Sequence, residues 1–425
     1  MFLQSNPTAG QLGELGVQRP DDVVVVSALR TAIGKARRGG FRDTTPDNLL
    51  KAVLEATIST TGMPYSELGN VVVGNVQLSG SYAGPARTAQ LRAGFPDSVP
   101  LNTVNRQCSS GLQAIADVAG AITSGSIEAG IGAGLESMSF GGGVATKKGE
   151  AAPKLDVDVE AIFSHPVAAE TLIPMGVTAE NVAERYGVTR EEQDKMAYDS
   201  NMRALKAAKE GRFKAEIVPV KTFVIDKATG EKTPITIDTD EGPRASTTME
   251  GLAKLKPAFK KGGATTAGNS SQVSDGAAAV LLMKRSKAAQ LGLPVIGVFR
   301  GYKVVGVKPD EMGVGPAFAI PPVCAALGIT PKDVDIFEIN EAFASQAVYC
   351  CKKLGLDMQK VNPNGGAIAL GHPLGATGAR QVATLLNELH RTHGKIGCVS
   401  MCIGTGMGMA AIFEAEGQRF KGMGQ

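Results

Sequence analysis

One local pattern recurs along this chain: a short run of β-branched or other apolar residues, then a segment in which apolar residues return at helical spacing. Residues 23–26 are consecutive valines, and in the following segment, 46–61, Leu50, Val53 and Leu54 share one stripe. Unbroken apolar runs are typical of strands buried on both faces, and such stripes are typical of helices. Similar runs occur at residues 71–73, 101–104, 129–135, 277–283, 295–299 and 334–339. The alternation predicts a layered α/β fold.

A charge-rich segment, residues 140–262, interrupts this pattern. Within it Thr189 and Glu192 form a capping-box pattern, which predicts the start of an amphipathic helix. We interpret the segment as an insertion of helices and loops into an α/β protein. The predicted division is a flexible N-terminal arm at 1–21, an N-terminal domain at 22–139 and 263–290, an inserted loop domain at 140–262, and a C-terminal domain at 291–425.

The two halves of the chain show the same order of elements. In the first half a predicted strand leads through the turn around Cys108 to a helix and then to the strand at 129–135. In the second half the turn around His372 opens a helix that is followed by an apolar run at 398–402. The shared order predicts an internal duplication, which would place Cys108 and His372 at equivalent helix N-termini that face one another.

Charge and cysteine content exclude several classes of protein. The net charge is +3, with 44 basic and 41 acidic residues, so no global field favours nucleic acid. No apolar run reaches the roughly 20 residues needed to span a bilayer. Six cysteines without a CxxC pair indicate a reducing compartment and give no zinc or redox motif. The ends of the chain show no secretory, mitochondrial or SKL-type signal, and the first basic residue is Arg19.

Cys108 has the sequence context of a nucleophile. It lies between a predicted strand and the first turn of a predicted helix, where unpaired N–H groups favour thiolate over thiol. A lone cysteine is more often a small buried side chain. However, its neighbours Arg106, Gln107, Ser109 and Ser110 are polar and poorly suited to a core.

His372 and Asn340 are candidate partners for this thiol. His372, held in a turn by Gly371 and Pro373, has the pKa range of a general base, although a structural histidine is the alternative. Asn340 follows an apolar run at the end of a predicted strand, where α/β sites form. It is suited to hold a water or to donate its amide to an oxyanion, whereas a helix N-cap is the alternative.

A second thiol and a polar loop complete the candidates. Cys402 precedes a glycine-rich turn containing Gly404, whose backbone N–H groups suit an oxyanion, although core packing is the alternative for the thiol. The glycine-bounded loop 268–276, which contains Ser271, lies in a chain region with Arg244 and several lysines. That combination suits a phosphate-bearing ligand, and a solvated basic face is the alternative.

Taken together, these segments resemble the thiolase family from about residue 22 to 416. The resemblance is carried by four motifs: NRQCSSG at 105–111, NEAF at 340–343, GHP at 371–373 and CIGTG at 402–406. Within the family the chain is most similar to the peroxisomal type of 3-ketoacyl-CoA thiolase, with which it shares the stretches 247–259 and 400–408.

The resemblance implies a five-layered αβαβα fold of two similar domains, a loop domain over the CoA site, and a homodimer, with a tetramer as the alternative. It implies no permanently bound cofactor and no metal; CoA and acyl-CoA are the partners. A peroxisomal location is implied by the core alone, because the family's N-terminal signal is not visible here.

The resemblance also assigns catalytic roles for thiolytic cleavage of 3-ketoacyl-CoA, the last step of β-oxidation. It implies that Cys108 attacks the 3-keto carbon after His372 takes its proton, and that Cys402 protonates the acetyl-CoA carbanion. His372 and a water on Asn340 would form one oxyanion hole. The backbone N–H groups of Cys108 and Gly404 would form the other.

By the same resemblance, Ser271 and Arg244 contact CoA and Met175 lines the acyl pocket. Pro174 stands where short-chain acetoacetyl-CoA thiolases usually have a histidine, which favours the degradative subgroup. The alternatives are an acetoacetyl-CoA thiolase acting in the synthetic direction, a decarboxylating condensing enzyme of the ketoacyl-synthase type, and a non-catalytic lipid carrier. Cys402 argues against the condensing enzymes, which need no acid–base cysteine.

Overall fold

The computed structural model describes residues 13–141 and 157–417, and one large mixed sheet runs through this part of the chain. In spatial order its N-terminal half contains β4 (Leu101–Val104), β3 (Asn70–Gly74), β5 (Ala129–Ser137), β9 (Ser274–Lys284) and β1 (Val23–Thr31). Its C-terminal half continues with β10 (Gly297–Gly306), β13 (Met407–Ala415), β12 (Ile396–Ile403) and β11 (Ile336–Ile339). The halves join where β1 runs antiparallel to β10, with Val24 opposite Val298 and Val25 opposite Gly297.

The strand pairing confirms the internal duplication. In the N-terminal half β4, β3 and β5 are parallel, and β9 and then β1 pair antiparallel beyond β5. In the C-terminal half β11 and β12 are parallel, and β13 and then β10 pair antiparallel beyond β12. A parallel bridge between Phe337 and Val361 stands on the far side of β11, in the place that β4 takes beside β3.

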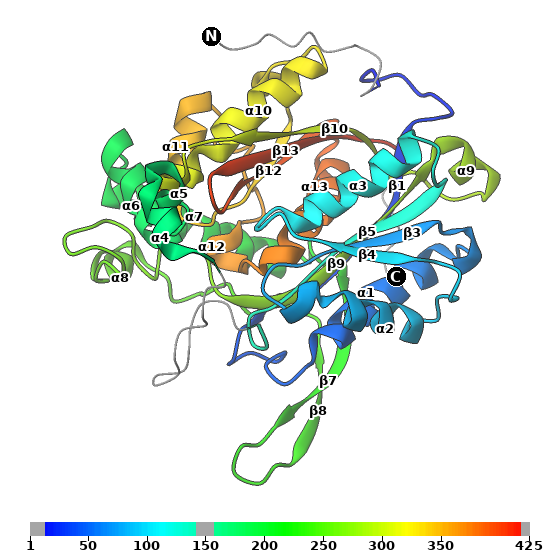
Figure 1. Ribbon diagram of the computed structural model, residues 1–425, viewed down its shortest axis with the longest axis horizontal. Coiled ribbons are helices and arrows are strands. Elements are labelled where there is room, and N and C mark those ends of the chain that lie inside the picture. The colour runs from blue at the N-terminus through cyan, green and yellow to red at the C-terminus, as the bar shows by residue number, and fades with distance from the viewer. Residues whose placement is uncertain (1–12, 142–156, 418–425) are drawn as a thin grey trace.

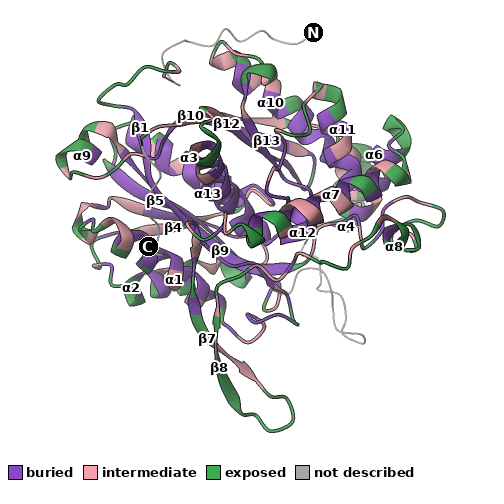
Figure 2. Cartoon of the chain, turned by 180° about the vertical axis from the view of Figure 1, so that it is seen from behind, coloured by how far each residue is buried: buried purple, intermediate pink, exposed green. Residues whose placement is uncertain are grey.

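Six helices in the described residues divide the structure into layers. Their bounds are α1 (Pro46–Thr61) and α2 (Ala83–Arg92) on one outer face, α3 (Ser110–Thr123) and α13 (Leu374–Thr392) in the middle, and α10 (Gly315–Ala326) and α11 (Ala344–Leu354) on the other outer face. Figures 1 and 2 show α3 and α13 side by side, with the strands around them buried.

Three apolar clusters fill the spaces between these layers. The first joins α1 to the N-terminal half of the sheet and includes Leu50 and Val71. The second surrounds α3 and α13 and contacts both halves, and the third joins α10 to β11 and β13. Helix layer, half-sheet, helix layer, half-sheet and helix layer therefore follow one another, which confirms the predicted five-layered αβαβα fold of two similar units.

The insertion leaves the sheet after β5 and returns at β9. It contains α4 (Val159–Ser164), α5 (Pro166–Glu170), α6 (Met175–Tyr186), α7 (Arg190–Lys209), β6 (Ile217–Val218), β7 (Val220–Ile225), β8 (Lys232–Ile237) and α8 (Met249–Ala253). The capping box predicted at Thr189 and Glu192 is present at the start of α7. The β7–β8 hairpin projects from the body of the molecule (Figure 1). The predicted domain boundaries stay a prediction, and part of the predicted loop domain, 142–156, lies outside the described residues.

The described part of the predicted arm contacts the C-terminal half. The Gly16 N–H donates to Glu414 Oε1 at 2.9 Å, and Arg300 Nη2 donates to the Val17 carbonyl at 2.9 Å. Residues 1–12 lie outside the described part, so flexibility of the arm stays a prediction. The remaining short elements are β2 (Gly34–Lys35), η1 (Tyr65–Glu67), η2 (Ser79–Tyr82), α9 (Arg285–Gln290), η3 (Pro309–Val314), η4 (Pro331–Asp333) and α12 (Ala367–Leu370).

A buried arginine side chain on the sheet binds the insertion through two ion pairs. The side chain of Arg30, on β1, is fully buried and lies 2.6 Å from Glu216 and 2.7 Å from Asp240. Asp240 accepts from both terminal nitrogens of Arg30 and also from the Ile33 N–H. Two carboxylates, one before and one after the hairpin, therefore converge on one buried guanidinium.

Removing one of these carboxylates should destabilise the protein strongly. We expect Asp240→Ala to lower the free energy of unfolding by about 3 kcal/mol or more, because it leaves a buried charge without its bidentate partner. Urea unfolding followed by circular dichroism measures this. Asp199→Ala, which breaks the exposed pair with Lys195, serves as the control and should cost far less. Equal losses of unfolding free energy in Asp240→Ala and Asp199→Ala would contradict the stabilising role assigned to Asp240.

Candidate active site

The first turns of α3 and α13 lie directly against one another. A Cβ added to Gly111 would stand 2.7 Å from the Gly375 carbonyl oxygen, and one added to Gly378 would stand 2.3 Å from the Leu112 nitrogen. Only glycine permits this approach of the two backbones. Cys108 lies two residues before α3 and His372 two residues before α13. The structure thus confirms that these residues precede equivalent helices whose N-termini meet.

Cys108 is buried and protonated at rest. Burial raises the pKa of its thiol to about 11, against the opposing effect of hydrogen bonds from the backbone of Gly404 and of Cys108 itself. The charge of Glu136 raises this pKa further. The prediction that the helix start favours a thiolate is therefore wrong for the resting protein, because desolvation outweighs the N–H donors. The contact with the Gly404 N–H does bring the predicted glycine beside the predicted nucleophile.

His372 is held as a neutral base. Its Nδ1 lies 2.6 Å from Thr377 Oγ1, and that hydroxyl donates its single hydrogen to the Pro373 carbonyl at 2.9 Å. Thr377 therefore accepts from Nδ1–H, which leaves the lone pair on Nε2. Nε2 lies 3.2 Å from Asn340 Nδ2, so the amide N–H is its donor. Burial, with the charge of Arg380, lowers the pKa of His372 to about 3.

Asn340 lies where the sequence predicts it, directly after β11. Its backbone N–H donates to the Ser400 carbonyl at 2.9 Å, which fixes it beside β12. It does not cap a helix, because α11 begins at Ala344 with Phe343 at the N-cap position. The side chain is fully buried, and within the described residues its Oδ1 has no partner. An unpaired acceptor beside His372 Nε2 is suited to fix a water molecule or a substrate group.

Cys402 lies at the end of β12 and is also a thiol at rest. Its Sγ donates to Gln346 Oε1 at 3.3 Å. Burial raises its pKa well above the ordinary value, and the presence of Cys108 raises it further, so the two sulfurs lie within electrostatic reach of each other. The turn that follows is tight, with φ of 69° at Thr405 and 95° at Gly406. This turn carries Gly404 back toward Cys108.

The residues predicted to bind CoA and the acyl chain surround this centre at greater distance. The Ser271 N–H donates to the Ala342 carbonyl at 3.0 Å, so the loop of Ser271 lies against the segment of Asn340. Arg244 is exposed, and its backbone N–H donates to Asn201 Oδ1 at 3.1 Å. Met175 is 37% exposed at the start of α6. No contact in the described structure joins Arg244 or Met175 to the two cysteines.

Three residues near the centre were not predicted from the sequence. Thr377 sets the tautomer of His372, and Gln346 accepts from Cys402. Glu136, fully buried at the end of β5, accepts from the N–H groups of Gln77 and Gly375 at 3.3 and 3.2 Å. Burial raises the pKa of Glu136 to about 7. Its place after an apolar glycine-rich run was the one signal in the sequence that marks it.

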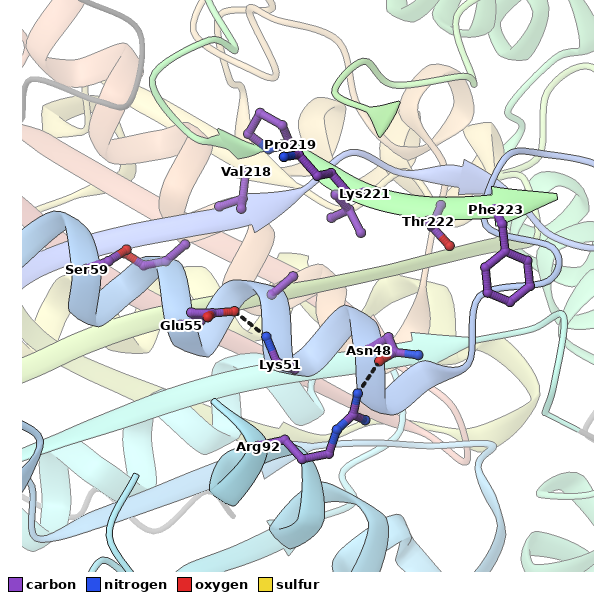
Figure 3. A pocket seen from close by; sticks show the side chains of 13 residues that line it. Asn48, Lys51, Glu55, Ser59, Arg92, Val218, Pro219, Lys221, Thr222 and Phe223 are labelled. Atoms are coloured by element: carbon purple, nitrogen blue, oxygen red, sulfur yellow. Dashed lines mark hydrogen bonds and ion pairs between the residues drawn. The ribbon is translucent and has the colours of Figure 1, made fainter. Parts of the chain in front are cut away.

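One surface groove lies away from this centre. A groove of about 600 Å³ opens between α1 and the strands β6 and β7 (Figure 3). Its walls carry the Lys51–Glu55 ion pair and the hydrogen bond of Arg92 to Asn48. None of the residues that line it is a predicted site residue.

Within residues 13–141 and 157–417, no group of three or more His, Cys, Asp and Glu side chains is arranged to hold a metal ion. In the same part of the chain, no helix has both the length and the apolar character that crossing a membrane requires.

Known proteins match the chain over nearly its whole length. The family models "Thiolase, N-terminal domain" and "Thiolase, C-terminal domain" match residues 23–286 and 293–415. The peroxisomal 3-ketoacyl-CoA thiolase A of Mus musculus is 57% identical over 416 residues, which are 98% of this chain and 95% of the mouse protein.

Two solved structures show the same fold. The dimeric peroxisomal thiolase of Saccharomyces cerevisiae superimposes with a TM-score of 0.85 at 48% identity, covering 94% of this chain and 99% of the yeast chain. Human mitochondrial 3-ketoacyl-CoA thiolase in complex with CoA gives a TM-score of 0.81 at 37% identity, covering 93% of this chain and 98% of the human chain. The chain therefore belongs to the thiolase family.

Proposed function

We propose that this protein is a 3-ketoacyl-CoA thiolase, an acetyl-CoA C-acyltransferase that cleaves 3-ketoacyl-CoA with a second CoA in the last step of fatty acid β-oxidation. The observation that carries the proposal is the second buried thiol, Cys402, within electrostatic reach of Cys108. The identity to the mouse 3-ketoacyl-CoA thiolase supports it. We assign the reaction to the peroxisome because the mouse and yeast relatives are named as peroxisomal.

The first step is attack by a neutral thiol. His372 Nε2 takes the proton of Cys108 while Sγ bonds to C3 of the substrate, so charge separates only when the substrate is present. The oxyanion that forms at C3 accepts from the backbone N–H groups of Cys108 and Gly404, the same groups that contact the sulfur at rest. The C2–C3 bond then breaks, leaving an acyl group on Cys108 and an enolate of acetyl-CoA.

The second thiol moves the proton at C2. Cys402 gives its proton to the enolate, whose thioester oxygen is held by protonated His372 and by a water on Asn340. Acetyl-CoA leaves, and the Cys402 thiolate takes the proton of the incoming CoA thiol. The CoA sulfur attacks the acyl carbon, and the departing Cys108 recovers its proton from His372. All protons and electrons balance over the cycle without a metal or a redox cofactor in any of these steps.

The substrates bind through the insertion and the loops beside it. We propose that Ser271 and Arg244 contact CoA, that Met175 lines the acyl pocket, and that the loop domain of residues 140–262 covers the CoA. CoA is then a co-substrate and no cofactor is held permanently. The yeast relative described as dimeric supports a homodimer.

The proposed activity has a direct test. We expect purified protein to convert 3-ketoacyl-CoA esters and CoA to acetyl-CoA and an acyl-CoA two carbons shorter. Chromatography of the CoA esters over a series of chain lengths measures this and gives the chain-length preference. Decarboxylation of malonyl-CoA without CoA-dependent cleavage of any 3-ketoacyl-CoA would contradict the proposal and favour a condensing enzyme.

The roles of the two cysteines are separable. We expect Cys402→Ala to slow hydrogen–deuterium exchange at C2 of acetyl-CoA by about 100-fold or more, because it removes the only proposed proton carrier for C2. Cys108 should remain open to alkylation in that variant, as shown by mass spectrometry of the modified peptide. Cys350→Ala, which removes another buried cysteine, is the matched control. Exchange at the wild-type rate in Cys402→Ala would refute the assigned role.

The neutral state of His372 predicts a pH profile. A base is lost when it is protonated, so a histidine with an ordinary pKa near 6.5 would cost about tenfold in kcat/KM between pH 7.5 and 5.5. Because its pKa is lowered to about 3, we expect His372 to contribute no step in that range. The pKa of Glu136, raised to about 7, is the other source of a step, and Glu136→Gln removes it. A step near pH 6.5 that survives in Glu136→Gln would contradict a neutral His372.

A further inference from the structure

The carboxamide of Gln346 stands directly behind the second thiol. Gln346 lies in the first turn of α11 and is fully buried. Its Oε1 accepts from Cys402 Sγ at 3.3 Å and from the Ala342 N–H at 3.2 Å. Ala342 belongs to the segment that begins at Asn340. One side-chain oxygen therefore joins Cys402 to the loop that carries Asn340.

Apolar side chains pack around the thiol that this carboxamide faces. Met312 and Ala342 pack with Cys402 in a small buried cluster, and Phe343 packs against it. Gly313 leaves the space that Gln346 occupies, since a Cβ there would stand 2.6 Å from the Gln346 Cβ. A buried amide in such a wall costs free energy unless its hydrogen bonds are made. The position is thus built around an amide.

At rest only the oxygen end of the Gln346 amide makes hydrogen bonds in the described structure. In the described structure Gln346 Nε2 is buried without a hydrogen-bond partner. A native donor left unpaired in this way needs an explanation. It belongs to the same planar group whose oxygen faces the Cys402 thiol, and rotation about the last side-chain bond exchanges the two ends of that group. A thiolate at Cys402 is stabilised by a donor, and Nε2 is an unpaired donor on the group that faces the sulfur.

We propose that Gln346 is a positioning residue for Cys402, with Oε1 holding the thiol and Nε2–H₂ stabilising the thiolate. The inference rests on the proposed function and deepens it. When the Cys402 proton passes to C2 of the enolate, the sulfur keeps the electron pair and the carboxamide turns its N–H toward it. This turn gives up the hydrogen bond from the Ala342 N–H to Oε1 until the thiol is restored. When the CoA thiol returns a proton to the sulfur, the oxygen faces the thiol again.

Two substitutions separate the two ends of the amide. Gln346→Met has a similar volume and removes both hydrogen-bonding ends. Gln346→Glu keeps acceptors for the Cys402 thiol and the Ala342 N–H and lacks the donor. The readout is hydrogen–deuterium exchange at C2 of acetyl-CoA as a function of pH. The rate of alkylation of Cys108 is measured in the same samples, as a check on the integrity of the first half of the site.

We expect Gln346→Met to slow exchange by about tenfold or more at every pH, the scale of one hydrogen bond to a charged group. Gln346→Glu should also be slow, and its deficit should grow with pH as the new carboxyl ionises against the thiolate. Alkylation of Cys108 should change less than threefold in both variants. Ser345→Ala is the matched control, because it removes a buried hydrogen bond of the same helix turn, to the Ala179 carbonyl at 3.0 Å, without touching Cys402.

Each result of this experiment either supports or overturns the proposed role of Gln346. Wild-type exchange in Gln346→Met, full rescue by Gln346→Glu at all pH values, or an equal loss in Ser345→Ala would overturn the inference. Slow exchange in both Gln346 variants with a normal Ser345→Ala supports it. Failure of the wild-type protein to cleave any 3-ketoacyl-CoA would instead overturn the proposed function, so the two failures are distinguishable.

Discussion

The contact between α3 and α13 is the constraint on which the site depends. Gly111 and Gly378 let the two backbones touch, and no larger residue fits between them. Each helix leads into a strand of its own unit, β5 after α3 and β12 after α13, so the contact also fixes how the units face each other. The sheet alone would not do so, since β1 and β10 pair only briefly. In the proposed mechanism Cys108 and His372 can act together because the two helix starts that follow them meet.

Burial is the second property of the centre, and it sets the resting protonation states of Cys108, Cys402 and His372. Burial raises the pKa of both thiols and lowers that of His372, so the uncharged forms are the stable ones at neutral pH. A neutral centre does not attract stray cations or oxidise as readily as an exposed thiolate. In the proposed mechanism the centre becomes reactive when a substrate carbonyl supplies an oxyanion that the Gly404 N–H holds. Burial thus keeps Cys108 unreactive when no substrate is bound. The same burial makes the reaction of Cys108 selective for its substrate.

The sequence predicts the layers, the duplication and the positions of Cys108, His372, Asn340 and Cys402, because each of these residues stands where a regular element begins or ends. Such ends carry local signals: glycine, proline, and a change from apolar to polar residues. Gln346 and Thr377 lie within helices and have no such signal; their importance comes from partners reached by tertiary contacts. The thiolate was wrongly predicted for a related reason. A helix start is visible in sequence, whereas the burial that opposes it depends on the whole fold.

The duplication has a consequence for how such a chain can change over generations. In the proposed mechanism the N-terminal unit supplies the attacking sulfur, while the C-terminal unit supplies the imidazole, the amide, the second sulfur and the Gly404 donor. Neither unit contains all of the proposed catalytic groups. Two copies of one ancestral architecture have become mutually dependent, so a gene encoding one unit alone would specify half a reaction. Natural selection that acts on a residue in one unit therefore also acts on the other unit. The boundary between the units reflects their common ancestry and does not separate two independent functions.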